Sequence, residues 1–349
     1  MPTIKDIAKL AGVSHGTVSN VMNKKGIVSI KKIKQVEDAA RALGYQRSAQ
    51  ASQLRQGHNR FVGVIIPDLK ETVYVDLFTS LDHYLRKFDY DVSVYFTRNM
   101  PHAEETALEQ VRSLNPDHVV VVSSLIKNDG VYDEKNRFIF VDRFVAKMPK
   151  NALFVSFDFE KAGFEIGEKV IADGHKNIAL FCGIQEFSDE KRFQIGLEKA
   201  LEKSPCTLQA FRGDYTLAFS VAFDLLSMNA LDAIVTPNAE RVEHLQSAIG
   251  FMPNRVLPAV YSITSTDILP VDNIINYELN YKMLGRKIGQ YILKSNEKGR
   301  VEKNYFQLPH DGFRFRFPRI QVVIVTLFAA NRHQRRVDRI GLRRIVSYC

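Results

Sequence analysis

Short, almost wholly apolar runs recur between residues 61 and 312, and they limit this part of the chain to few folds. Strands buried on both faces of a parallel sheet have this near-continuous apolar character, whereas strands with one face in water alternate. Segments with helical periodicity separate the runs, so strand and helix alternate along the chain. This alternation predicts an α/β body with parallel sheets, and two sets of runs indicate two lobes.

The expected strands are FVGVIIPD (61–68), DVSVYF (91–96), HVVVVSS (118–124), RFIFVDR (137–143), KNIALFCG (176–183), LDAIVTP (231–237) and VLPAVYSI (256–263). Helical stretches are expected at 77–88, 103–114, 191–203, 218–228 and 240–249. Ligands of open α/β sheets bind beyond the carboxyl ends of the strands. Candidate ligand-binding residues should therefore follow strand ends.

The first 46 residues have a wholly helical pattern instead. Thr3, with Asp6 three positions later, is typical of a capped helix start, and Gly12 ends this first helix. Ser14 is placed to cap a second short helix, and two short helices joined by a glycine-containing turn form a helix-turn-helix. A third helix is expected between Ser29 and Gly44, with an apolar stripe of Ile30, Ile33, Val36, Ala40 and Leu43.

Short polar side chains gather at the start of the second helix, outside the expected core. Base-edge reading in the major groove requires such side chains at a helix start. Surrounding lysines suit phosphate contacts, which position a protein on DNA without reading its sequence. A protein-docking module is the alternative for three such helices. The candidate DNA-binding residues of this head are Thr3, Lys5, His15, Gly16, Thr17, Ser19, Asn20, Asn23, Ser29, Lys31 and Lys32.

The net charge of +9 is unevenly distributed. Residues 1–60 carry 11 basic and 3 acidic side chains, residues 61–312 carry 28 and 35, and residues 313–349 carry 9 and 1. A basic head on an acidic body indicates a polyanion-binding module attached to a part that does not bind polyanions. A merely basic, solvated surface is the alternative.

The segment TIKDIAKLAGVSHGTVSNVMN, followed by VS and KIKQVEDAARALGY, resembles the DNA-binding head of the LacI/GalR (lactose-repressor) family without a gap through Tyr45. The resemblance implies that His15, Gly16 and Asn20 read bases. It also implies a periplasmic-binding-protein-like body with a small-molecule effector, sugar or sugar-like, between its lobes. The implied protein is a homodimeric transcriptional regulator, a repressor of a carbohydrate-related operon, on an inverted-repeat DNA operator.

Residues 47–60 are polar and by themselves predict a flexible linker. The resemblance implies a hinge that becomes helical only on operator DNA. Leu54 then wedges a central base step apart in the minor groove, with Ala51 and Gln53 beside it. Arg47 stands where the family usually has proline.

Polar residues after strand ends are candidates for the effector site. Asp158 follows FVSF, Ser123 follows VVVV and Asn238 follows AIVTP. The resemblance adds Arg192, which matches an arginine that grips sugar hydroxyls or a carboxylate, and Tyr74, near an aromatic position stacked on the ligand. Asn276 completes the set. For each, capping or ion pairing is the alternative role, as it is for Asp142 and Arg143 after FIFV.

The expected pocket departs from the family pattern at two strand ends. Asn238-Ala239 replaces an Asn-Asp pair, and Tyr261-Ser262-Ile263-Thr264 replaces a Gly-Phe/Tyr-Asp-Asp turn. Missing carboxylates remove acceptors for hydroxyl groups. The ligand is therefore less sugar-like, negatively charged or absent, and a body that senses a partner protein stays open.

The sequence holds no GxSxG, HExxH, glycine-rich phosphate loop or metal-spaced His/Cys set, so we expect no enzyme, cofactor or metal site. A two-lobed enzyme with a DNA-binding head is the alternative. No apolar run reaches membrane-spanning length, and the N-terminus lacks a signal-peptide pattern. The three cysteines have no CxxC spacing, which favours a reducing cytoplasm.

The domains are therefore expected as a head (1–46), a hinge (47–60), a body (61–312) and an Arg-rich tail (313–349). Lobe 1 comprises about 61–156 and about 282–312, and lobe 2 about 157–281. Up to Lys303 the chain has 24 Lys and 15 Arg, but after it 9 Arg and no Lys. Such a change suggests sequence of different origin, such as a frameshifted end, with a DNA-binding basic arm as the alternative.

Overall fold

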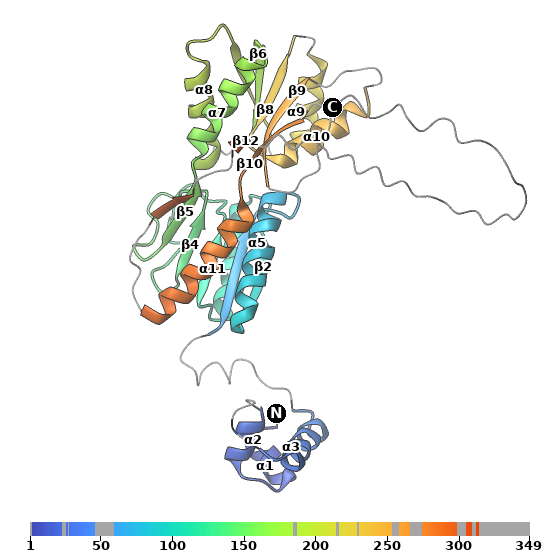
Figure 1. Cartoon of the computed structure of the whole chain (residues 1–349), viewed down its shortest axis with the longest axis vertical. Coiled ribbons are helices and arrows are strands. Elements are labelled where there is room, and N and C mark those ends of the chain that lie inside the picture. Colours follow the sequence, from blue (N-terminus) through green and yellow to red (C-terminus); the bar gives the residue numbers. More distant parts are fainter. Residues whose placement is uncertain are drawn as a thin grey trace, which may run out of the picture. The chain divides into compact units, whose positions relative to one another are not determined.

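The computed structural model describes residues 2–22, 26, 28–45, 59–183, 187–213, 216–228, 230–252, 258–265, 274–298, 305–308 and 312–313. They form a three-helix bundle and two six-stranded sheets with helices packed against them (Figure 1). Asn23, the hinge residues Arg47, Ala51, Gln53 and Leu54, and the tail beyond Phe313 lie outside the described residues. No helix in these ranges is long and apolar enough to span a bilayer.

The bundle consists of α1 (Ile4–Ala11), α2 (His15–Met22) and α3 (Ile30–Ala42). The predicted capping box is confirmed, because the Thr3 hydroxyl accepts from the Asp6 amide and the Thr3 amide donates to the Asp6 carboxylate at 2.7 Å. Gly12 ends α1 at φ +62°, a left-handed conformation that glycine adopts without a Cβ clash. The Ser14 hydroxyl accepts from the Thr17 amide at 3.2 Å and so caps α2 as predicted.

One small core joins the three helices. Ile7, Val18 and Val36 are fully buried in it, one from each helix. The prediction that Ile30 belongs to the apolar stripe of α3 was wrong, because its side chain is 85% exposed. Three residues of an α-helix cover about 300°, which is about 60° short of a full turn. Ile30 and Val36 are two such steps apart, so their side chains lie about 120° apart around the helix axis. Ala39 is buried there instead.

The first sheet has the order β11-β5-β4-β3-β1-β2, with all neighbouring strands parallel. Helices α5 and α11 pack on one face of it and α6 on the other. Its elements are β1 (Phe61–Ile66), α5 (Thr72–Leu85), β2 (Asp91–Phe96), α6 (Pro101–Ser113), β3 (His118–Val121), β4 (Phe138–Val141), β5 (Leu153–Phe157), α11 (Tyr281–Lys298) and β11 (Tyr305–Leu308).

The second sheet has the order β12-β10-β9-β8-β6-β7 and is parallel except for β12. Helices α7 and α8 pack on one face, and α9 and α10 on the other. Its elements are α7 (Phe159–Ala172), β6 (Asn177–Cys182), α8 (Ser188–Leu201), β7 (Thr207–Arg212), α9 (Ala218–Ser227), β8 (Ala233–Thr236), α10 (Ala239–Ile249), β9 (Ala259–Thr264), β10 (Ile274–Glu278) and β12 (Gly312–Phe313).

The helical layers explain why the strands are apolar along their whole length. In β1, Val62, Val64 and Ile66 belong to the core shared with α5 and α11, whereas Phe61 and Ile65 belong to the core shared with α6. Successive side chains of a strand point to opposite faces, so both sets must be apolar when both faces are covered. The predicted α/β body with parallel sheets is confirmed.

Elements outside the predicted segments include α7, β7, β10 and α11. Gly163 and Gly167 lower the helix propensity of α7, and β7 is an edge strand with exposed residues. Helix α5 begins at Thr72, five residues before the predicted start, and ends at Leu85. The short strand β12 pairs with β10 of the second sheet, whereas residue 312 was expected in lobe 1 and 313 in the tail.

Candidate functional site

The outer face of α2 carries the residues expected to read DNA. His15, Gly16 and Asn20 are exposed there, while Thr17 and Ser19 are half-buried beside them. Val18, between them in sequence, is fully buried and fixes which face of the helix points outward. The eight residues of α2 contain no acidic side chain, so nothing on this helix repels a phosphate.

Exposed lysines lie at the starts of the two other helices. Lys5 lies in the first turn of α1, and Lys31 and Lys32 lie in the first turn of α3, after the exposed Ser29. Thr3, the other DNA-binding candidate, is engaged in capping α1. The bundle thus presents short polar groups at the start of one helix and exposed lysines at the starts of the two others, residue types that suit base reading and phosphate contacts.

In the body, a cavity of about 290 Å³ lies between residues of the two sheets. This is near the lower limit for a small-molecule site. The first-sheet side contributes Glu71, before α5, and Arg98, Asn99 and Met100, after β2. The second-sheet side contributes Phe187 and Glu190 at the start of α8, and Asn238, Glu240 and Arg241 at the start of α10, among others.

Charged and amide groups in this cavity are held by one another. The Asn238 side-chain amide donates to Glu71 at 3.3 Å, which links the two sides. The Arg241 guanidinium lies 3.8 Å from Glu190, whose carboxylate also accepts from the Gly183 amide at 2.8 Å. These pairings place ionic groups at the wall of a cavity where little water screens them.

Burial raises the pKa of the Glu71 carboxyl to about 7, and the negative charge of Glu240 adds to the shift. Arg241 and the hydrogen bond from Asn238 act in the opposite direction. Burial likewise raises the pKa of Glu240, opposed mainly by Arg241 and His244. Two nearby buried carboxyl groups cannot both be ionised without cost, so the pair favours either a proton or a cation between them.

Three polar atoms at the cavity wall have no hydrogen-bond partner in the described part of the chain. They are Oδ1 of Asn238, Oε1 of Glu240 and Nε of Arg241. Buried polar atoms are nearly always hydrogen-bonded, so unsatisfied ones at a cavity indicate a site for a polar partner. Two of the three are acceptors and one is a donor.

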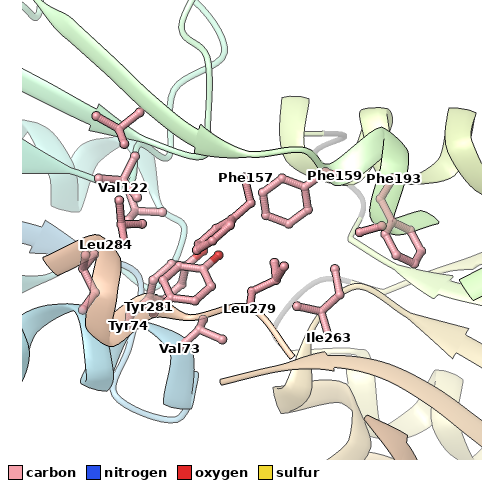
Figure 2. Close-up of a cluster of buried hydrophobic side chains, with 14 of the residues drawn as sticks. Val73, Tyr74, Val122, Phe157, Phe159, Phe193, Ile263, Leu279, Tyr281 and Leu284 are labelled. Atoms are coloured by element: carbon pink, nitrogen blue, oxygen red, sulfur yellow. The ribbon is translucent and has the colours of Figure 1, made fainter. Parts of the chain in front are cut away.

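Of the six residues expected at the effector site, Asn238 alone lines this cavity. Tyr74 lines an adjoining space of about 20 Å³, which shares Glu71 and Asn238 with the cavity and is itself too small for an organic ligand. Its ring packs edge-on against Tyr281 with 6.2 Å between the ring centroids. Tyr281 in turn packs against Phe157 with 4.9 Å between the centroids. Figure 2 shows these rings within one cluster of buried apolar side chains. In this structure the Tyr74 ring is buried in that cluster, next to the cavity.

The other expected residues bond to the protein itself. Arg192 donates to the Asp142 carbonyl at 2.9 Å and to the Ser156 hydroxyl at 2.8 Å. Asp158 is the N-cap of α7 and accepts from the Lys161 amide at 3.0 Å. Ser123 is fully buried and donates to Glu104 at 2.7 Å.

Asn276 lies in β10, in register with Ser262 of β9 and away from the cavity lining. Asp158 thus has the capping role that the sequence left as its alternative, whereas Ser123 makes a buried hydrogen bond to Glu104.

A second set of contacts ties the two sheets together beside the cavity. Arg143, after β4, lies 3.4 Å from Asp189 of α8, and both side chains are buried. Its guanidinium also donates to Asn99 at 2.6 Å and stacks 3.9 Å from the centre of the Phe187 ring. Because Asn99 and Phe187 also line the cavity, this ion pair fixes part of its wall.

The sequence reasoning missed the three carboxylates Glu71, Glu190 and Glu240. It predicted acceptors directly after strands, where Ala239 replaces the usual aspartate, whereas these carboxylates lie at or before helix starts. The sequence offered one signal for this carboxylate wall: Glu240 lies two residues after Asn238, which was itself expected at the site. No group of three or more His, Cys, Asp or Glu side chains in the described ranges is placed to hold a metal ion.

A helix-turn-helix bundle joined to a two-lobed α/β body with a polar cavity defines the class of DNA-binding regulators with a ligand-binding body. Residues 3–48 match the family model of bacterial regulatory proteins, lacI family. Residues 59–245 match the model of periplasmic binding proteins and sugar binding domain of LacI family. The chain therefore belongs to the LacI family, and its predicted resemblance is confirmed.

Curated relatives include the HTH-type transcriptional repressor PurR of Haemophilus influenzae strain PittEE, 28% identical over 60% of this chain. The chain spans 62% of the length of that relative. PurR of Mannheimia succiniciproducens is 27% identical over 72% of this chain and 82% of its own length. Catabolite control protein A of Priestia megaterium is 28% identical over 61% of this chain and 66% of its own length.

Solved structures share the fold at low identity. The lac repressor dimer bound to operator and the anti-inducer ONPF matches with a TM-score of 0.69 and 22% identity, over 90% of this chain and 98% of that one. Cra from Pseudomonas putida in complex with fructose 1-phosphate matches with a TM-score of 0.64 and 18% identity, over 73% of this chain and 98% of that one.

Proposed function

We propose that this protein is a sequence-specific transcriptional repressor of a carbohydrate-related operon that binds an inverted-repeat operator as a homodimer. The observation that carries the proposal is the outer face of α2, with His15, Gly16 and Asn20 exposed above a core that Val18 anchors. In this proposal those three residues read base edges, and Lys5, Lys31 and Lys32 contact phosphates.

The proposed domains are the head (1–46), the hinge (47–60), the two-lobed body (61–312) and a tail. Paired hinges from two subunits are proposed to enter the minor groove, with Leu54 wedging the central base step. The resemblance to the family supports this assignment for Leu54, Ala51 and Gln53.

The body is proposed to bind a small-molecule effector, because a cavity with unsatisfied polar atoms fits a small polar ligand better than a partner protein's surface. Effector binding shifts the lobes between arrangements that favour or disfavour operator binding, which requires different affinities for the two arrangements. We propose a regulatory rather than a catalytic role, in keeping with the regulators among its relatives.

The experiment is a selection of random double-stranded DNA by the full-length protein at moderate ionic strength, followed by sequencing. We expect enrichment of an inverted repeat. Asn20→Ala should reduce enrichment at a defined base pair in each half-site, since a lost base contact costs about 1–3 kcal/mol at that position. Glu243→Gln, on the exposed face of α10, is the control and should select the same sequence.

Failure to enrich any sequence would overturn the proposal. Enrichment of a single half-site without a second, inverted copy would contradict the dimer. A wild-type selection profile for Asn20→Ala would remove α2 from the reading role.

A further inference from the structure

The cavity of the body has a marked excess of negative charge on its buried side. Glu71, Glu190 and Glu240 are 5%, 6% and 6% exposed, respectively. The cations on the wall are Arg241, which is buried, and Arg98, which is exposed to solvent. The chemistry of these side chains therefore restricts the charge of any molecule that enters.

The buried cations near Glu71 and Glu240 already have anionic partners. Arg143 pairs with Asp189 at 3.4 Å, and Arg241 lies 3.8 Å from Glu190. No cation of the described residues lies within ion-pair distance of Glu71, whose hydrogen bond comes from the neutral amide of Asn238.

The strongest cationic influence on Glu240 comes from Arg241, whose guanidinium also lies 3.8 Å from Glu190. The His244 Nε2 atom, one turn along α10, lies 3.5 Å from Oε1 of Glu240, too long for a well-formed hydrogen bond, and its presence lowers the pKa of Glu240. Lys70, in the loop before α5, adds a weaker attraction to Glu240 from a position exposed to solvent. Fixed cations thus leave the Glu71–Glu240 pair undercompensated, and Oε1 of Glu240 still lacks a hydrogen-bond donor in the described ranges.

We propose that the cavity binds a small organic cation, a molecule that carries an amine or guanidinium group, with that group between Glu71 and Glu240. Its N–H groups donate to the free oxygens of Glu240 and Asn238, and its charge neutralises the carboxylate pair. Phosphorylated and carboxylated molecules are rejected, because they add a third negative charge to a buried acidic wall. This proposal names the effector class and rests on the proposed function only for calling the ligand an effector.

The same geometry couples binding to proton release. The free protein holds a proton on the carboxylate pair for part of the time near neutral pH, since the pKa of Glu71 is about 7. A cation between the carboxylates favours their charged forms and drives that proton into the solvent. Affinity for a permanently charged cation therefore increases as pH rises through 7, whereas affinity for a neutral polyol lacks this increase.

The test compares matched probes that differ in charge, with thermal shift and calorimetry on the full-length protein. Guanidinium is compared with urea, its neutral isostere, and glucosamine with glucose and glucose 6-phosphate, all at millimolar concentration. We expect the cationic member to bind about tenfold or more tightly than its neutral counterpart in at least one set. Tighter binding of a neutral or anionic member, or no binding of either cation, would overturn the proposal.

Proton release is measured with guanidinium in two buffers of different ionisation enthalpy near pH 7. Guanidinium does not titrate there, so any released proton comes from the protein. We expect about half a proton per bound cation. Zero release contradicts the place assigned to the cation.

Glu71→Gln keeps the shape and removes one charge, and it should abolish both the charge preference and the proton release. Glu243→Gln removes one charge from the exposed face of α10 and should leave both unchanged. Circular dichroism verifies that the Glu71→Gln variant is folded, and Glu240→Gln provides the second variant at the pair. If both Glu71→Gln and Glu240→Gln still prefer the cationic probe, the proposal is wrong.

The DNA selection described above reports on operator recognition and not on the charge preference of the cavity. An intact inverted-repeat preference with no cation preference refutes the ligand class and leaves the regulator standing. Cation binding by a protein that selects no DNA sequence refutes the regulator and leaves the ligand class standing.

Discussion

Glu71 is held in a buried position, next to a second carboxyl group and beside an amide that donates one hydrogen bond to it. Its folded-state pKa of about 7 lies above the ordinary value of 4.5. The folded protein therefore binds more protons than the unfolded chain between these values. The unfolding free energy must fall as pH rises through this window.

We predict that Glu71→Gln flattens this dependence. A shift of this size corresponds to about 3 kcal/mol of stability, lost by the wild-type protein as pH rises from 4.5 through 7. The measurement is urea unfolding at pH values across this range.

Asp142 contributes a slope of the same sign at lower pH, because burial raises its pKa from 3.8 to about 6. The comparison between variant and wild type is therefore sharpest above pH 6. Equal slopes for the two proteins there would show that Glu71 does not titrate in this window.

The lysines of the head allow a second prediction at the scale of single residues. Lys31→Ala or Lys32→Ala should weaken binding to every duplex by a similar factor and reduce the slope of log affinity against log salt by about one, since each removes one phosphate contact. Lys87→Ala, exposed in the body, is the matched control and should leave the slope unchanged. A loss confined to one DNA sequence would contradict a phosphate role.

At the scale of elements, α7 and α8 pack side by side with glycines at their closest approach (Figure 1). A Cβ atom at Gly163 would meet the Phe193 carbonyl of α8, and one at Gly196 would meet the Glu160 carbonyl of α7. Neither backbone can move without moving its helix. The glycines that made α7 a poor helix by sequence are thus the residues that let it pack.

We predict that Gly196→Ala destabilises the body by about 1–3 kcal/mol, because overpacking forces two helices apart. Gly250→Ala, at the end of α10, should cost much less, since its added methyl carbon meets no atom closer than 3.2 Å. Urea unfolding monitored by circular dichroism compares the two. Similar stability of the two variants would mean that the helices separate without cost.

At the scale of the whole molecule, the buried pair of Arg143 and Asp189 joins the two lobes at 3.4 Å. Arg143→Met leaves a buried aspartate without its cation and should cost about 3–5 kcal/mol. The double variant with Asp189→Leu should recover part of that loss, because neither charge then remains unpaired. Additive losses in urea unfolding would show that the two lobes are not coupled through this pair.

The DNA-facing part of the candidate site could be predicted because it is local. His15, Gly16 and Asn20 lie within one helix, and helical periodicity alone separates them from buried Val18. The cavity could not be predicted in this way. Its carboxylates come from three segments more than a hundred residues apart at the extremes, and no periodicity relates Glu71 to Glu240.

Local signals along the chain were enough for the three helices of the head, the parallel α/β body and the family. Capping residues, glycine turns and apolar runs act over a few neighbours, so their effect is readable in the order of residues. Long-range packing was needed to show that Tyr74 packs against Tyr281, that Arg192 bonds to the backbone of Asp142, and that acidic helix starts form the cavity wall. Those outcomes depend on which surfaces meet after folding, and burial among distant partners is what sets the charge of the site.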